Sequence, residues 1–147
     1  MQVGLGPIGA AVARQLAIRK GFRIVAAIDI DPIKVGRDVG DVAELGRPIR
    51  VKVTTDLRKT VKVAKPDIAV LCTSSSLTRV MPQLEELMKL RLPVVSTTEE
   101  LAYPAPRNRR LAKQLDQMAR KAKVAVLGTG VNPGFAMPVE APVVPSR

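Results

Sequence analysis

Apolar and polar residues alternate along this chain in a regular order of short and longer stretches. Continuous apolar runs typical of strands buried on both faces occupy residues 23–29, 68–73, 93–97 and 123–127, and a shorter alternating run covers 50–53. Between these runs, apolar residues recur at every third or fourth position, which predicts helices with one buried side. Those helices are expected over residues 8–20, 56–64, 77–91 and 108–122, with a glycine-punctuated loop over 30–46.

Strands that alternate with amphipathic helices predict an α/β fold, a doubly wound parallel sheet with helices on both faces. Right-handed crossovers place the loops that follow the strands at one edge of such a sheet, where open α/β sheets bind their ligands. In this chain those loops carry the small and polar segments GLGPIG, DIDP, CTSSS, STTEE and GTGVNPG. A ligand site is therefore expected at this edge.

Residues 4–9, GLGPIG, fit the G-x-G-x-x-G pattern of Rossmann-type dinucleotide-binding domains and precede a predicted helix. In that pattern the first glycine permits a tight turn, the second lets the backbone approach a pyrophosphate, and the third lets helix and strand pack closely. The helix N-terminus then presents free N–H groups to the phosphates. The predicted cofactor-binding residues of this segment are Gly4, Gly6, Pro7, Ile8 and Gly9.

Asp29 ends the apolar run over residues 23–29, about 20 residues beyond Gly9, where an acid that binds the ribose hydroxyls is expected. Such an acid favours NAD over NADP. Asp31 is the alternative ribose acid, although an acid before Pro32 is also typical of a turn. Lys34 is near enough in sequence to meet a 2′-phosphate, so NADP stays open as the second candidate cofactor.

Two further strand ends contribute candidate residues. Cys72, Thr73 and Ser74 lie at the end of the apolar run over residues 68–73 and are predicted to lie beside the cofactor, although Cys72 also suits a small buried apolar position. Thr98 is predicted to bind the cofactor from the next strand end, ahead of two adjacent acids, Glu99 and Glu100. These acids are interpreted in two ways, as a catalytic base and as first-turn acids of a helix capped by a threonine.

Composition limits the chemistry that the chain can perform. Its 147 residues suit one domain, and with no histidine and one cysteine it has no ligands for a Cys/His zinc site and no His-dependent triad. No metal site is predicted. The net charge of +11 invites a nucleic-acid interpretation, but the basic residues are scattered and lack interleaved aromatics, so a solvated basic surface is favoured. The absence of long apolar runs and of a signal-peptide pattern predicts no membrane segment and a cytoplasmic protein.

Five segments in order, GLGPIG, VGRDVGDVAELG, CTSSSLTRVMPQLEEL, VVSTTEELAYP and GTGVNPGFAM, resemble the nucleotide-binding half of the 2,4-diaminopentanoate dehydrogenase family and its amine-dehydrogenase relatives, neighbours of dihydrodipicolinate reductase. The resemblance covers residues 2 to about 137. It implies NAD(P)-dependent oxidative deamination of a small amine, in homo-oligomeric enzymes with a second, substrate-binding domain. It also implies that Glu99 or Glu100 handles the amine or the attacking water and that Asn132 lies near the nicotinamide.

The chain departs from this family at both ends. Only Met1, Gln2 and Val3 precede the first glycine, so the first strand is expected to be truncated. Residues 1–137 are predicted to form the NAD(P)-binding domain, and the aperiodic, proline-rich residues 138–147 to be the start of an absent substrate domain. The alternatives are a dihydrodipicolinate reductase, which acts on an imine, and a non-catalytic nucleotide-binding module.

Overall fold

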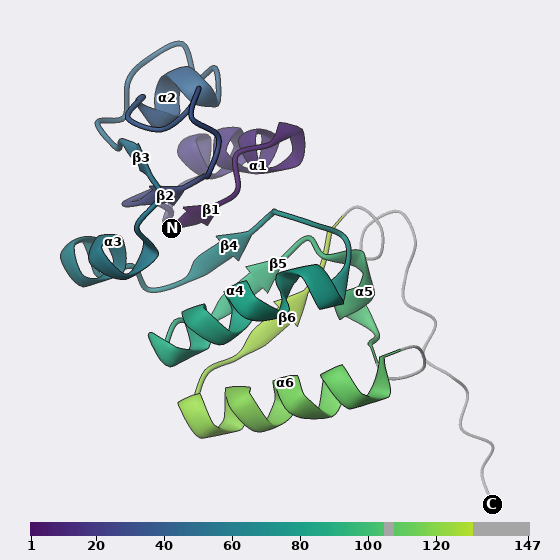
Figure 1. Cartoon of the computed structure of the whole chain (residues 1–147). Helices are drawn as coiled ribbons and strands as arrows, with labels where there is room; N and C mark the ends of the chain where they lie inside the picture. Colours follow the sequence, from purple (N-terminus) through teal and green to yellow (C-terminus); the bar gives the residue numbers. More distant parts are fainter. Residues whose placement is uncertain (105–107, 131–147) are drawn as a thin grey trace, which may run out of the picture.

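The strands of this protein form one parallel sheet (Figure 1). The structure is a computed structural model that describes residues 1–104 and 108–130. The sheet has six strands in the order β3-β2-β1-β4-β5-β6, and every strand pair within it is parallel. The strands are β1 (Gln2–Val3), β2 (Ala27–Ile28), β3 (Val53–Thr54), β4 (Ala69–Leu71), β5 (Val94–Ser96) and β6 (Val126–Gly128). This order confirms the predicted Rossmann-type doubly wound sheet.

Helices connect the successive strands. They are α1 (Pro7–Ile18), α2 (Val39–Val42), α3 (Leu57–Ala64), α4 (Leu77–Lys89), α5 (Glu99–Ala102) and α6 (Arg109–Ala122). Four of the six match the predicted helices closely, and β6 lies slightly later than the run predicted over 123–127. The strands are shorter than the apolar runs because only two or three residues of each strand pair in the parallel ladders.

The loop predicted over residues 30–46 is wrong in part, since α2 lies within it. Asp38 is the N-cap of this helix, and its Oδ1 accepts the N–H of Gly40 at 2.7 Å. The same oxygen accepts the N–H of Ile49 at 2.9 Å, a contact between segments distant in sequence. Burial raises the pKa of Asp38, but the backbone N–H donors, Ile49 first, outweigh it and lower the pKa overall. A four-residue helix held by such contacts leaves no periodic signal in the sequence.

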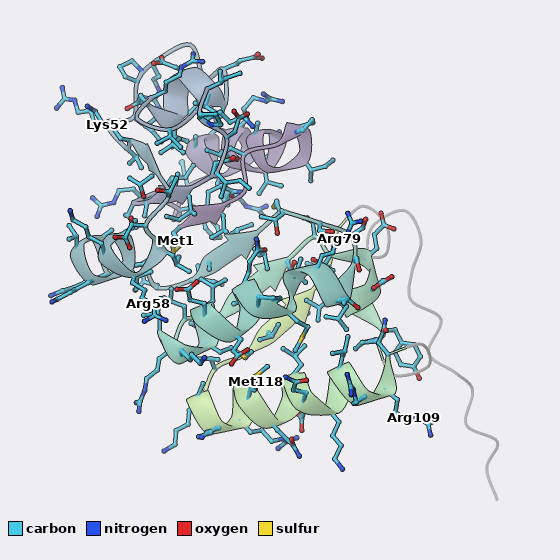
Figure 2. The ribbon with its side chains drawn as sticks, viewed as in Figure 1. Met1, Lys52, Arg58, Arg79, Arg109 and Met118 are labelled. Carbon is cyan, nitrogen blue, oxygen red and sulfur yellow. The ribbon has the colours of Figure 1, made fainter. Side chains whose placement is uncertain are left out.

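Two apolar clusters lie on the opposite faces of the sheet. The larger packs α4 and α6 against β4, β5 and β6, and Met118 of α6, labelled in Figure 2, packs against it. Its fully buried members include Leu71, Leu77, Leu84 and Leu87. The smaller packs α1 and α2 against the other face and includes Leu5, Ala13, Ala27, Val39 and Val53. No helix in the described ranges has the length and apolarity required to cross a membrane.

Strand β1 is the centre of the sheet and sets the position of the site. It pairs with β2 on one side and with β4 on the other. Strands β2 and β3 therefore extend the sheet in one direction from β1, and β4, β5 and β6 extend it in the opposite direction. The loops after β1 and β4 separate there and leave a crevice beyond the carboxyl ends of the strands, which is the place where sheets of this type bind ligands.

Candidate functional site

The glycine loop after β1 has no room for side chains at two of its three glycines. Gly4 has a φ of +85°, and a Cβ there would lie 2.6 Å from the carbonyl oxygen of Cys72. A Cβ on Gly9 would lie 2.1 Å from the carbonyl oxygen of Gly4. These glycines let the loop, β4 and the start of α1 come together. The loop geometry therefore follows from contacts that only glycine tolerates.

Gly6 differs, because a Cβ there would meet no atom within 4 Å. Gly6 is the N-cap of α1, and no side-chain cap bond is found at that end of the helix among the described residues. The free N–H groups and partial positive charge of the helix end thus adjoin open space that a side chain on residue 6 would fill. Pro7 and Ile8, both exposed, form the start of α1 beside this space. The arrangement suits the pyrophosphate of a dinucleotide.

Asp29 lies directly after β2 and is held by the backbone on both of its carboxylate oxygens. Oδ2 accepts the N–H of Leu5 at 2.6 Å, and Oδ1 accepts the N–H of Asp31 at 2.9 Å. Its side chain is only 10% exposed. The structure thus brings the predicted ribose acid against the glycine loop, as the motif requires.

Lys34 and Asp31 lie beside this acid. The Nζ of Lys34 is 3.0 Å from Oδ2 of Asp31 and 3.8 Å from Oδ2 of Asp29. The hydrogen bond from Lys34 is the main cause that lowers the pKa of Asp31, followed by the N–H of Ile33. Asp31 is therefore not the acid nearest the glycine loop but the main partner of Lys34.

Two cavities meet at the crossover of the sheet. One of about 320 Å³ is lined by Gly4, Gly6, Asp29, Ile30, Lys34 and Gln83, and the other, of about 1150 Å³, by Pro7, Ile8, Ser74, Thr97, Glu99 and Gly130. Gly6, Cys72 and Thr73 line both. The volumes and the shared lining suit an elongated ligand that passes over the glycine loop from one cavity to the other.

The residues after β4 lie where the sequence predicts. Cys72 is a free, half-buried thiol at the boundary of the two cavities, not the fully buried apolar residue of the alternative interpretation. Thr73 Oγ1 donates to Oε1 of Gln83, a residue of α4 that the sequence analysis did not identify. Nothing in the helical pattern distinguishes Gln83 from any other half-exposed polar residue of that helix.

The two adjacent glutamates have different surroundings. Glu99 is exposed and lines the larger cavity. Glu100 instead accepts the N–H of Leu77 on Oε2 at 2.8 Å, so it caps α4 from the neighbouring helix α5. Both glutamates lie in the first turn of α5, as the capping interpretation predicts, but the carboxylate of Glu100 bonds to the start of another helix, α4.

Thr98 is the N-cap residue of α5 but makes no side-chain cap bond. Its buried hydroxyl donates to the carbonyl oxygen of Ser74 at 2.8 Å and bonds to Ser96 Oγ at 2.8 Å. Ser96 Oγ in turn donates to the carbonyl oxygen of Leu71. The buried hydroxyl of Thr98 therefore links the loops after β4 and β5. Its hydrogen bonds go to protein atoms.

Gln2 is a second residue that the sequence analysis missed. It is completely buried in β1, and its Nε2 donates to the carbonyl oxygen of Gly4 at 2.9 Å. A polar residue inside a buried strand, next to a glycine motif, was the available signal. Asn132 and residues 138–147 lie outside the described residues, and within the described ranges no cluster of three metal-ligating side chains occurs.

No protein-family model matches the chain. It is 32% identical over 136 residues to 2,4-diaminopentanoate dehydrogenase of Acetoanaerobium sticklandii, covering 92% of this chain and 38% of that protein. The solved amine dehydrogenase of Mycobacterium smegmatis superposes with a TM-score of 0.81 at 36% identity, over 88% of this chain and 38% of that one. The resemblance predicted from the sequence is confirmed, and the chain spans less than half the length of both relatives.

Two weaker similarities bear on the alternatives. A redox-sensing transcriptional repressor Rex of Caldicellulosiruptor saccharolyticus is 34% identical over 83 residues, which is 56% of this chain and 35% of that protein. A dihydrodipicolinate reductase of Paenisporosarcina sp. TG-14 has a TM-score of 0.58 at 19% identity, over 85% of this chain and 44% of that one. The second similarity shows a shared fold alone.

Proposed function

We propose that this chain is the NAD(P)-binding domain of an oxidoreductase that acts on a CH–NH₂ group, in the manner of the diaminopentanoate and amine dehydrogenases it resembles. The observation that carries the proposal is the open space at Gly6, at the start of α1, with Asp29 bonded to Leu5, the preceding residue of the same loop. The similarity to two dehydrogenases over most of the chain supports it.

The residues of the crossover fit such a cofactor. The backbone N–H groups of Gly6, Ile8 and Gly9 at the start of α1 suit the pyrophosphate, while Pro7 lies beside them and has no N–H to donate. Asp29 is an acceptor for the adenosine ribose hydroxyls. Because a carboxylate there repels a 2′-phosphate, NAD is favoured over NADP. Cys72, Thr73 and Ser74 would border the other half of the cofactor, and we retain Asn132 as a further candidate.

When bound, the nicotinamide supplies the hydride chemistry of amine oxidation or imine reduction. The chain's own contribution is to fix the cofactor and to provide a proton acceptor. Glu99 is the better candidate for that acceptor, since its side chain lines the cavity whereas Glu100 is occupied by the N-terminus of α4. Thr98 would act indirectly, by fixing the carbonyl of Ser74 and with it the loop that borders the cavity.

The proposed context follows from the family. The substrate would be a small amine or imine bound by a second domain, the full-length enzyme a homo-oligomer, and the location the cytoplasm. No nucleic-acid partner is proposed, although the Rex similarity keeps a redox-sensing module as the alternative from another class. A DNA affinity that falls steeply with salt would favour that alternative.

Isothermal titration calorimetry with NADH tests the proposal on the chain itself. Gly6→Val should abolish binding, because its side chain fills the space through which the backbone approaches the pyrophosphate. Ser76→Val is the matched control, since it places the same residue at the N-cap of α4 outside both cavities. Equal NADH affinity in the parent and in Gly6→Val, both folded by circular dichroism, would contradict the proposal.

A further inference from the structure

The ribose end of the smaller cavity carries three charges in close contact. Asp29 and Asp31 are two carboxylates, and the ammonium group of Lys34 lies 3.8 Å from the first and 3.0 Å from the second. Lys34 and Asp29 line the cavity, and their side chains are 26% and 10% exposed. The local charge of the group is therefore −1, with its one cation held nearer to the acid that does not line the cavity.

The geometry distinguishes this pair from an ordinary surface ion pair. Lys89 and Glu85 in α4 form a bridge of similar length, 2.9 Å, but their side chains are 65% and 43% exposed and lie outside the cavities. Lys34 is less than half as exposed as Lys89. A charge at the cavity wall is screened less by water, so its position affects a charged ligand more strongly.

The two dinucleotide cofactors differ at the adenosine ribose, where NADP carries a phosphate and NAD a hydroxyl. A hydroxyl donates to Asp29 without needing Lys34. A phosphate needs a cation, and the cation available is bonded to Asp31. To bind the phosphate, Lys34 must give up its bond to Asp31, and the Asp31 carboxylate is then left without its cation near the phosphate.

We infer, on the basis of the function proposed above, that Asp31 is a positioning residue that determines cofactor choice. It holds Lys34 away from the place of a 2′-phosphate, and so it adds to the preference for NAD that Asp29 establishes. Asp31 acts through Lys34 and not by contact with the cofactor. This predicts that removing the charge of Asp31 turns Lys34 into a phosphate-binding residue.

The test compares the dissociation constants of NADH and NADPH by calorimetry in Asp31→Asn, in Lys34→Met and in the double variant. Asparagine keeps an oxygen for the N–H of Ile33, so the turn survives while the charge is lost. Asp31→Asn should lower the Kd of NADPH relative to that of NADH by about tenfold, because Lys34 is then free to form one charge-assisted hydrogen bond to the 2′-phosphate. Adding Lys34→Met should abolish that gain. Glu85→Gln is the control, since it removes an equal charge from the comparable pair in α4.

The outcomes separate this inference from the proposed function. A ratio that shifts in Asp31→Asn and not in Glu85→Gln, and returns in the double variant, supports it. The inference is overturned if Asp31→Asn leaves the ratio of the two Kd values unchanged, or if the gain in NADPH binding persists in the double variant that lacks Lys34. In either case, NADH binding by the parent would leave the proposed function standing. Absence of binding of either cofactor by the parent would remove both.

Discussion

The backbone N–H of Leu5 donates to the Asp29 carboxylate over 2.6 Å, which joins the end of β2 to the glycine loop after β1. The acid placed to bind the ribose is thus also part of the structure that shapes the pyrophosphate loop. Because one carboxylate serves both purposes, substitutions of Asp29 are expected to change affinity as well as cofactor preference. The two effects are separable by the choice of the replacing residue.

Asp29→Ser is expected to shift the preference toward NADPH and to weaken NADH binding, because serine removes the charge and is too short to hold Leu5. Asp29→Asn removes only the charge and keeps an acceptor for the N–H of Leu5. NADH affinity should fall roughly tenfold in Asp29→Asn and further in Asp29→Ser. Calorimetry with both cofactors measures this, and NADH affinities equal to that of the parent would show that Asp29 does not contact the ribose.

Gly9→Ala is expected to destabilise the fold, because its Cβ would meet the Gly4 carbonyl at 2.1 Å. Overpacking against backbone of this kind costs about 1–3 kcal/mol of unfolding free energy, measured by urea denaturation. Gly6→Ala is the matched control within the same loop, since its Cβ meets nothing within 4 Å. If both variants lost the same stability, the close approach at Gly9 would not be the cause.

The two glutamates are expected to differ in their effect on stability. Glu100→Ala removes the carboxylate that accepts the N–H of Leu77 at the start of α4, which should cost about 1 kcal/mol. Glu99→Ala changes an exposed side chain that makes no such bond to the described part of the chain, and it should stay within about 0.5 kcal/mol of the parent. Equal losses in urea denaturation would contradict this division of roles.

In catalysis we expect Glu99 to matter more than Glu100, the reverse of their expected effects on stability. A chimera that joins this chain to the substrate domain of an amine dehydrogenase provides the measurement. Glu99→Gln should lower its turnover roughly 100-fold while NADH binding survives, as for the loss of a general base. Glu100→Gln should keep turnover near that of the parent. If neither variant loses turnover, the base lies in the substrate domain.

Acid should weaken the contribution of Asp38 to stability. Its pKa is lowered in the folded state by the N–H groups of Ile49 and Gly40, so the stabilisation is complete above the unfolded pKa near 3.8 and is lost as pH falls through the lower folded value. The difference in Tm between the parent and Asp38→Ala should therefore be constant from pH 7 to 5 and shrink below pH 4. A difference independent of pH down to 2 would show that the charge is irrelevant.

The sequence alone determined the fold class and most of the elements. Apolar runs identify strands such as β4, and the 3-and-4 spacing of Val80, Leu84 and Leu87 identifies α4, because burial of one face imposes those periods locally. The spacing of residues 4–9 and Asp29 likewise predicts which loops meet, since parallel strands bring their carboxyl ends to one edge. Each of these signals is contained in a short stretch of chain.

The tertiary structure decided what each polar side chain binds. The sequence does not distinguish the roles of the adjacent residues Glu99 and Glu100. Only the packing of α5 beside the start of α4 brings Glu100 to the N–H of Leu77 and leaves Glu99 at the cavity. Likewise, Asp31 is bonded to Lys34 and Asp29 to Leu5 because of distances across the fold. A hydrogen bond depends on tenths of an ångström between distant segments, and hydrophobic periodicity carries no information at that scale.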